Sequence, residues 1–275
     1  MTLSATPLTD DMLRAWLPPR ARASHKGDYG HVLVVGGDHG MAGAVRLAGE
    51  AAARTGSGLV SIATRAAHAA VIAAACPELL CHGVECARDL RVLLQRASVV
   101  AIGPGLGQSA WAHDMLAAVL QMRLPRVVDA DALNLLAQEP MQCDHWVLTP
   151  HPGEAARLLD MTTKQVQADR LQAAQALQQR YGGVCVLKGA GTLVCTSESV
   201  AICEAGNPGM ASAGMGDVLT GVIAGLLAQG LSLVDAACAG VYIHAKAGDR
   251  AAQEGERGLL ASDVMPHLRK LVNPC

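Results

Sequence analysis

Short apolar runs alternate along the chain with longer stretches that are rich in Ala and Leu. Several of the short runs are apolar throughout, which is the pattern of a parallel strand that is buried on both faces. The predicted strands are 31–35, 59–63, 98–102, 126–129, 146–149 and 184–188. The predicted helices are 42–54, 110–121, 132–138, 153–160, 164–181, 217–229, 233–253 and 262–271.

This alternation of strands and helices predicts an α/β fold, with a mostly parallel central sheet and helices on both faces. After strand 184–188, the apolar runs 193–195 and 200–203 follow too closely for crossover helices. We therefore predict a small antiparallel meander at the edge of the sheet. Because no repeat, low-complexity tract or linker interrupts the pattern, we expect one domain over 1–275, with an N-terminal extension over 1–24.

The composition narrows the class of protein. A chain of 275 residues that is 51% hydrophobic is not disordered, and it suits one large α/β domain. A net charge of -2 and 2% aromatic residues argue against nucleic-acid polymers as partners. Without any Phe, the core must consist of Leu, Val, Ile, Met and Ala, which favours close packing of helices on the sheet through small residues.

Neither the N-terminus nor the most apolar stretch suggests a membrane. Residues 1–20 lack the layout of a signal peptide, and the apolar stretch 218–233 is interrupted by Gly, Thr and Gln. The nine cysteines contain no C-x-x-C pair, and the cluster 76–86 fits no zinc spacing. We therefore expect a cytoplasmic protein whose free thiols lie in a reducing compartment.

Glycine-rich or polar segments follow the predicted strands, where ligands bind in open parallel sheets. The six segments are 36–44, 103–107, 129–134, 149–154, 188–192 and 206–217. No segment matches G-x-G-x-x-G or ends in Gly-Lys-Ser/Thr, which excludes the dinucleotide fingerprint and the P-loop. One glycine loop is usually a tight turn. Six at one edge indicate a ligand site, because bare backbone N–H groups can hold phosphate oxygens.

The last segment leads into a helix that we expect to begin at about Asp217. The free N–H groups of that helix could hold a phosphate. The helix terminus would favour the ionised form of Asp217, which could then take a proton from a substrate hydroxyl. Asp is also a favoured N-cap, and the local sequence by itself favours this simpler interpretation.

Two further segments leave alternatives open. His151 and Glu154 either begin a helix, with Glu154 complementing its dipole, or contact substrate and approach a nucleotide-bound magnesium ion. Lys188 is either a phosphate contact or a solvated lysine at a strand end. The amphipathic helix 164–181 is assigned no function.

The motifs together resemble the signature of the ADP/ATP-dependent NAD(P)H-hydrate dehydratases, which belong to the ribokinase-like superfamily. The matching segments are 26–37, 103–107, 129–134, 149–154, 188–189 and 206–221. They follow in family order from about residue 25 to residue 265. The resemblance implies repair of NADH and NADPH hydrated at the nicotinamide ring, at the expense of ADP or ATP with Mg²⁺. The ring hydroxyl would be phosphorylated, with Asp217 as general base, and phosphate would then be eliminated.

The resemblance also implies roles for single residues. The residues implied to contact the hydrated dinucleotide are Ala44, Gly105, His151 and Asp217. Those implied to line the ADP site are Lys188, Gly189, Ala190, Gly191, Thr192 and Gly216. Asn207 and Glu154 are expected near phosphates or magnesium, and the magnesium ligands stay open. With so few aromatic rings, the bases are expected to lie against aliphatic side chains and glycine backbone.

Two other functions remain as alternatives to the dehydratase. A ribokinase-like kinase of a small hydroxylated vitamin precursor would release a stable phosphorylated product. A nucleotide-sensing module would bind without chemistry, although it has no need for Asp217. Related kinases often have Asn where His151 stands, which favours the dehydratase. Because the motifs begin near the start of the chain, a separate epimerase is expected, and the resemblance implies a homotetramer. The sequence separates neither ADP from ATP nor NADH hydrate from NADPH hydrate.

Overall fold

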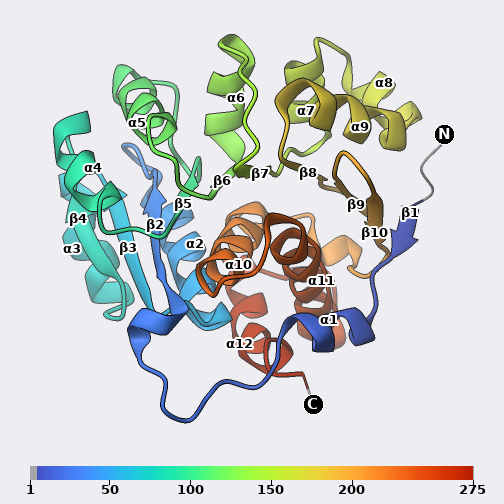
Figure 1. The fold of residues 1–275 in the computed structure, drawn as a ribbon, viewed down its shortest axis with the longest axis horizontal. Coiled ribbons are helices and arrows are strands. Elements are labelled where there is room, and N and C mark those ends of the chain that lie inside the picture. The colour runs from blue at the N-terminus through green and yellow to red at the C-terminus, as the bar shows by residue number, and fades with distance from the viewer. Residues whose placement is uncertain (1–4, 275) are drawn as a thin grey trace.

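The computed structural model describes residues 5–274, and its ten strands form one sheet in the order β1-β10-β9-β8-β7-β6-β5-β2-β3-β4 (Figure 1). The strands are β1 Ala5–Pro7, β2 His31–Val35, β3 Leu59–Thr64, β4 Leu80–Gly83, β5 Val99–Ile102, β6 Arg126–Val128, β7 Trp146–Leu148, β8 Val184–Leu187, β9 Thr192–Cys195 and β10 Val200–Cys203. The helices are α1 Asp10–Trp16, α2 Ala42–Thr55, α3 Ala66–Ala75, α4 Ala87–Leu94, α5 Ala110–Leu120, α6 Ala130–Gln138, α7 Pro152–Leu159, α8 Thr163–Ala168, α9 Arg170–Tyr181, α10 Met215–Ala228, α11 Leu233–Ala251 and α12 Ala261–Leu271.

The sheet is parallel except where β8, β9 and β10 pair antiparallel, which confirms the predicted fold class and meander. The meander is not the outermost part of the sheet, however. Strand β1 pairs parallel with β10 and places Ala5 opposite Val200. The predicted N-terminal extension therefore adds a strand to the sheet, although residues 1–4 of it lie outside the described residues.

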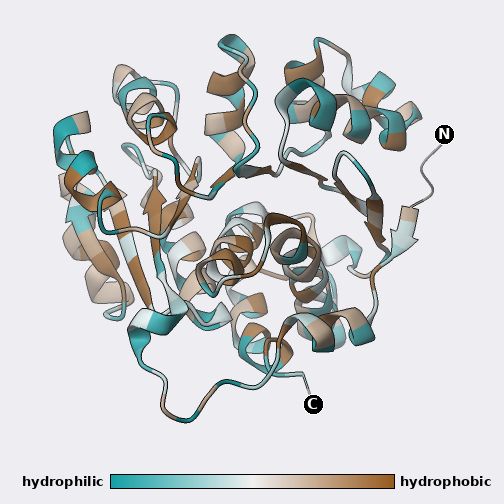
Figure 2. Ribbon diagram, viewed as in Figure 1, coloured by the Kyte–Doolittle hydropathy of each residue, from teal (hydrophilic) through white to brown (hydrophobic). Residues whose placement is uncertain are grey.

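Helices cover both faces of the sheet (Figure 1). One core contains buried residues of α1, α2, α3, α10, α11 and α12, and a second core contains those of α4 to α9. The central strands between them are mostly apolar (Figure 2). All four residues from Val32 to Val35 are completely buried, as expected of a parallel strand with helices on both sides.

Small residues bring the two helices α2 and α10 into close contact. A Cβ atom on Gly221 would lie 2.0 Å from the carbonyl oxygen of Ala48, and one on Gly225 would lie 2.8 Å from that of Ala52. Any larger side chain at these positions of α10 would force the two helices apart. The contact fixes the start of α10 relative to α2, and both helices begin at the predicted ligand loops.

The structure corrects several predicted elements. Helix 164–181 is divided into α8 and α9 at Asp169, whose backbone is not helical and whose carboxylate accepts a hydrogen bond from the Gln172 N–H at 2.9 Å. Helix α10 begins at Met215, two residues before the predicted start. Five elements were not predicted: β1, β4, α1, α3 and α4.

The structure also bears on the membrane and the thiols. Within residues 5–274, every helix is too short or too polar to cross a bilayer. Each of the eight described cysteines is a free thiol, and Cys275 lies outside the described residues. Burial raises the pKa of the Cys195 thiol to about 11 and that of Cys238 to about 12, so both stay protonated at neutral pH.

Candidate active site

The carboxyl ends of the parallel strands form one edge of the sheet, and a cavity of about 780 Å³ opens there. The segments after β6, β7, β8 and β10 line it, together with part of α11. The cavity brings together ten residues for which the sequence predicted a role: Glu154, His151, Lys188, Gly189, Ala190, Gly191, Thr192, Asn207, Gly216 and Asp217. These four segments therefore share one space that is large enough for a nucleotide-sized ligand.

Ala44 and Gly105 do not line this cavity. They contact each other instead, because a Cβ atom on Gly105 would lie 3.1 Å from the Cβ of Ala44. The β2–α2 loop (residues 36–41) and the β5–α5 loop (residues 103–109) thus form a second, adjoining pair. The roles of Ala44 and Gly105 as substrate contacts remain predictions.

The N-terminus of α10 faces the cavity. Gly214 is the N-cap in a left-handed conformation with φ of 88°, and no side chain caps the helix. The first backbone N–H groups of α10 are therefore available to a ligand. Asp217 lies in the first turn of the helix, so the simpler interpretation of Asp217 as the N-cap is wrong.

The pKa of Asp217 is higher than the helix terminus led us to expect. Burial and the neighbouring Asp129 carboxylate raise the pKa of Asp217 to about 7, although Lys188 opposes the shift. We expected the helix terminus to keep this group ionised, but desolvation outweighs the dipole. The Asp217 carboxylate makes no hydrogen bond to any residue in the described part of the chain, and it lines the cavity. A carboxylate whose pKa is close to the working pH is well suited to be a general base.

The raised pKa of Asp217 predicts a pH-dependent cost in stability. The folded protein binds this proton more tightly than the unfolded chain, so wild type loses stability as pH rises from about 4 to about 7. Asp217→Asn removes the cost, and its Tm should exceed that of wild type by at least about 3 °C at pH 8. The difference should shrink towards pH 5 in thermal melts. The exposed Asp114→Asn on α5 is the control, and an equal Tm gain there would contradict the assignment.

Lys188 is held by buried carboxylates. Its Nζ lies 2.6 Å from Asp129 Oδ1 and 3.8 Å from Glu154 Oε2, and Asp129 Oδ2 accepts the hydroxyl of Thr220 at 2.8 Å. Burial favours neutral Lys188, but Asp129 and Glu154 outweigh it and raise the pKa of Lys188. The interpretation of a solvated strand-end lysine is therefore wrong. A Cβ on Gly216 would lie 3.3 Å from Nζ, so glycine lets the ammonium lie beside the start of α10.

His151 and Glu154 combine the two open interpretations. His151 is the N-cap of α7: its Nδ1 accepts the N–H of Gly153 at 2.9 Å, and its own N–H donates to Glu154 Oε2 at 2.7 Å. Burial and Lys188 lower the pKa of His151, so the ring is neutral with its proton on Nε2. His151 therefore caps a helix and also offers a donor at the cavity wall, where Nε2 lies 3.4 Å from Glu154 Oε1.

The carboxylates of the cavity do not form a magnesium site. Glu154 is engaged by the His151 backbone and ring and faces Lys188, while Asp129 is engaged by Lys188 and Thr220. No group of three or more His, Cys, Asp or Glu side chains within residues 5–274 is placed to hold a metal ion. The side chains present thus do not fit a protein cage for magnesium.

Sequence analysis missed two residues, of which one supports a turn that lines the cavity and the other lines the cavity itself. Arg170, in the helix that was assigned no function, donates Nη2 to the carbonyls of Leu187, Lys188 and Gly191 at 3.2, 3.3 and 3.2 Å and so holds the turn after β8. His244 on α11 lines the cavity, and its buried Nε2 has no hydrogen-bond partner among the described residues. Burial lowers the pKa of His244 to about 4, so it is neutral. Neither residue has a local sequence signal, because each reaches its place from a distant helix.

The cavity has no Trp or Tyr among its described lining residues. Trp146 and Tyr181 are instead completely buried in the core of α4 to α9. The surfaces available to a base are thus aliphatic side chains and glycine backbone, as the composition led us to expect.

A family model described as NAD(P)H-hydrate dehydratase matches residues 32–270. The chain is 59% identical over 274 residues to the bifunctional NAD(P)H-hydrate repair enzyme of Coxiella burnetii, which covers 97% of this chain and 56% of that relative. The chain thus spans about half the length of this relative. It is 40% identical to the ADP-dependent (S)-NAD(P)H-hydrate dehydratase of Neisseria meningitidis, over 92% of this chain and 88% of that one. The ADP/ATP-dependent NAD(P)H-hydrate dehydratase from Bacillus subtilis, co-crystallised with ATP and Mg²⁺, matches with a TM-score of 0.87 and 30% identity over 97% of both chains.

Proposed function

Because this chain belongs to the NAD(P)H-hydrate dehydratase family, we propose that it returns hydrated NADH and NADPH to their active forms at the expense of ADP or ATP. The observation that carries the proposal is the position of Asp217. It lies in the first turn of α10, in a cavity that also holds Lys188 and the glycine-rich turn after β8. A base and a phosphate-binding helix start in one cavity suit phosphoryl transfer to a hydroxyl.

Each step can be assigned to a group of this chain. The free N–H groups of α10 and the Lys188 ammonium bind the terminal phosphates of the nucleotide. The Asp217 carboxylate accepts the proton of the ring hydroxyl while the hydroxyl oxygen attacks the terminal phosphorus of the nucleotide. The leaving group is AMP when the nucleotide is ADP, and ADP when it is ATP. The carbon–oxygen bond then breaks, inorganic phosphate departs, and the adjacent ring carbon loses a proton as the double bond returns.

Other parts of the proposal follow from the resemblance. Magnesium would offset charge on the nucleotide phosphates, and no step above depends on it because the described side chains offer it no cage. We further propose that the protein is a cytoplasmic homotetramer. The eight described free thiols suit the reducing cytoplasm. An epimerase activity would convert the other epimer of the hydrate into the substrate.

The decisive assay gives the protein hydrated NADH with ADP, ATP or no nucleotide. We expect the absorbance of reduced nicotinamide to recover only with a nucleotide, and inorganic phosphate to appear in equal amount. Hydrated NADPH in parallel shows which dinucleotide is preferred. A stable phosphorylated product without phosphate release would favour the kinase alternative. Tight binding of nucleotide without any turnover would favour the sensor and refute the proposal.

A further inference from the structure

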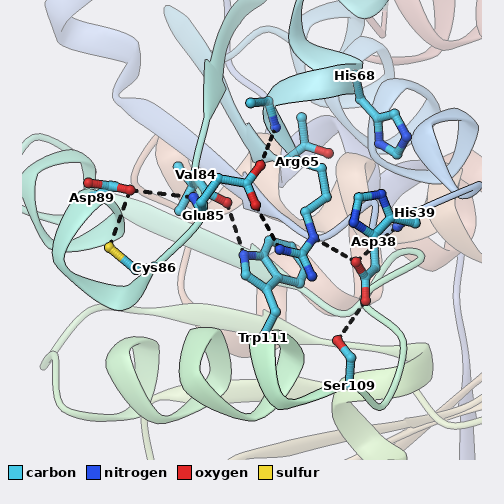
Figure 3. Close-up of polar contacts among 12 residues, drawn as sticks. Asp38, His39, Arg65, His68, Val84, Glu85, Cys86, Asp89, Ser109 and Trp111 are labelled. Atoms are coloured by element: carbon cyan, nitrogen blue, oxygen red, sulfur yellow. Dashed lines mark hydrogen bonds and ion pairs between the residues drawn. The ribbon is translucent and has the colours of Figure 1, made fainter.

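A buried carboxylate joins three loops at the carboxyl edge of the sheet (Figure 3). Asp38, in the β2–α2 loop, is only 7% exposed. Its Oδ1 accepts hydrogen bonds from Arg65 Nε at 2.7 Å and from the backbone N–H of His39 at 2.9 Å. Its Oδ2 accepts a hydrogen bond from the hydroxyl of Ser109 at 2.7 Å. Because Arg65 directly follows β3 and Ser109 ends the β5–α5 loop, one side chain ties together the loops after β2, β3 and β5.

The partners of Asp38 are themselves fixed. The Arg65 guanidinium lies 4.4 Å from the ring centroid of Trp111 and donates Nη1 to Glu85 at 2.8 Å on its other side. The Trp111 indole N–H donates to the carbonyl of Val84 at 2.9 Å. Burial would raise the pKa of Asp38, but the hydrogen bonds from Ser109 and Arg65 outweigh it and lower that pKa. Asp38 is therefore a charged group with three donors in set positions.

Asp38 also holds the β5–α5 loop through its backbone. Its N–H donates to the carbonyl of Gly105 at 2.7 Å, and the N–H of Gly37 donates to that of Pro104 at 3.0 Å. Asp38 thus contacts the β5–α5 loop at two places, with its backbone N–H at Gly105 and with its side chain at Ser109. This loop carries Gly105, and the segment just after the β2–α2 loop carries Ala44. The distance between these two residues therefore depends on Asp38.

We propose that Asp38 is a positioning residue that, with Arg65 and Ser109, sets the spacing of the two loops that receive the hydrated dinucleotide. This inference rests on the proposed function, because it takes Ala44 and Gly105 as substrate contacts. A buried ion pair is a weak source of stability, since apolar residues of similar size often stabilise as well. It does impose one geometry on the loops that it joins, which a binding site requires.

A matched pair of variants tests the proposal. Asp38→Asn and Glu85→Gln each remove the negative charge of one carboxylate that is paired with Arg65. Only Asp38→Asn changes the contacts between the β2–α2 and β5–α5 loops. We expect Asp38→Asn to raise the KM for hydrated NADH about tenfold or more, with the KM for ADP and kcat within about twofold of wild type. Glu85→Gln should leave all three unchanged. In hydrogen exchange, the amides of the two loops should exchange faster in Asp38→Asn only.

Ser109→Ala keeps the ion pair and serves if Asp38→Asn fails to fold. It should raise the KM for hydrated NADH by roughly three- to tenfold, because it removes one hydrogen bond to a charged group. An unchanged KM for hydrated NADH, or equal increases for both ligands, would overturn the proposal. If wild type showed no nucleotide-dependent repair, the proposed function would be refuted instead. Faster amide hydrogen exchange in the two loops of Asp38→Asn would still show that Asp38 positions them.

Discussion

Asp217→Asn is expected to lower kcat for the repair of hydrated NADH by about 10²–10⁴-fold. The amide cannot accept the proton of the ring hydroxyl, while its size and place in α10 are unchanged. Wild-type kcat should rise with pH and level off above about pH 7, because only the ionised form of Asp217 acts as base and its pKa is about 7. The residual kcat of the variant should not show this rise with pH. Steady-state rates between pH 5.5 and 8.5 provide the measurement.

Two controls separate the chemistry from folding and binding. The variant should bind ADP with a Kd within about threefold of wild type, because the backbone of α10 is unchanged. The exposed variant Asp114→Asn should keep the wild-type rate. If Asp217→Asn turned over at the wild-type rate, another group would have to be the base. His244, which is neutral and lines the cavity, would then be examined next.

Lys188→Met is expected to destabilise the protein by about 3–5 kcal/mol, because it leaves a buried carboxylate without its cation. The Asp129 carboxylate is 2% exposed and would keep only the hydroxyl of Thr220 as a donor. The same variant should weaken ADP binding, because it removes a positive charge beside the start of α10. Urea denaturation gives the free energy of unfolding, and titration calorimetry gives the Kd for ADP.

The double variant Asp129→Asn/Lys188→Met distinguishes the two effects. It removes both charges, so most of the lost stability should return. ADP binding should stay weak, because the ammonium is still missing. A double variant that regained ADP binding would show that Lys188 serves the fold alone. A single variant as stable as wild type would contradict the ion pair itself.

Most of the sheet could be predicted from sequence because its parallel strands are buried on both faces. Strands β2, β3 and β5 to β10 were found within one residue at each end. Helix α3 was missed because it consists of Ala66–Ala75 with only Ile72 buried, so it has no apolar periodicity. Strand β1 was missed because three residues with a proline give no local signal. Its partner, β10, lies far along the chain.

The candidate site followed from glycine-rich loops, because their place after parallel strands already fixes the edge at which they meet. What local sequence could not supply were the interactions between loops. The ion pair of Asp38 and Arg65 joins residues that are 27 positions apart. The pKa of Asp217 depends on burial and on Asp129, which only the folded chain brings near it. Local reasoning considered only the helix terminus and therefore missed the raised pKa of Asp217.

The pairing of β1 with β10 has a consequence for biosynthesis. Ala5 leaves the ribosome long before Val200, which lies opposite it in the finished sheet. At about 5–20 residues per second, roughly 10–40 s pass before β10 has been made. During that time β1 has no partner strand, and its short length and Pro7 limit pairing with other chains. Docking of β1 is therefore a late event in folding, which can follow completion of the meander.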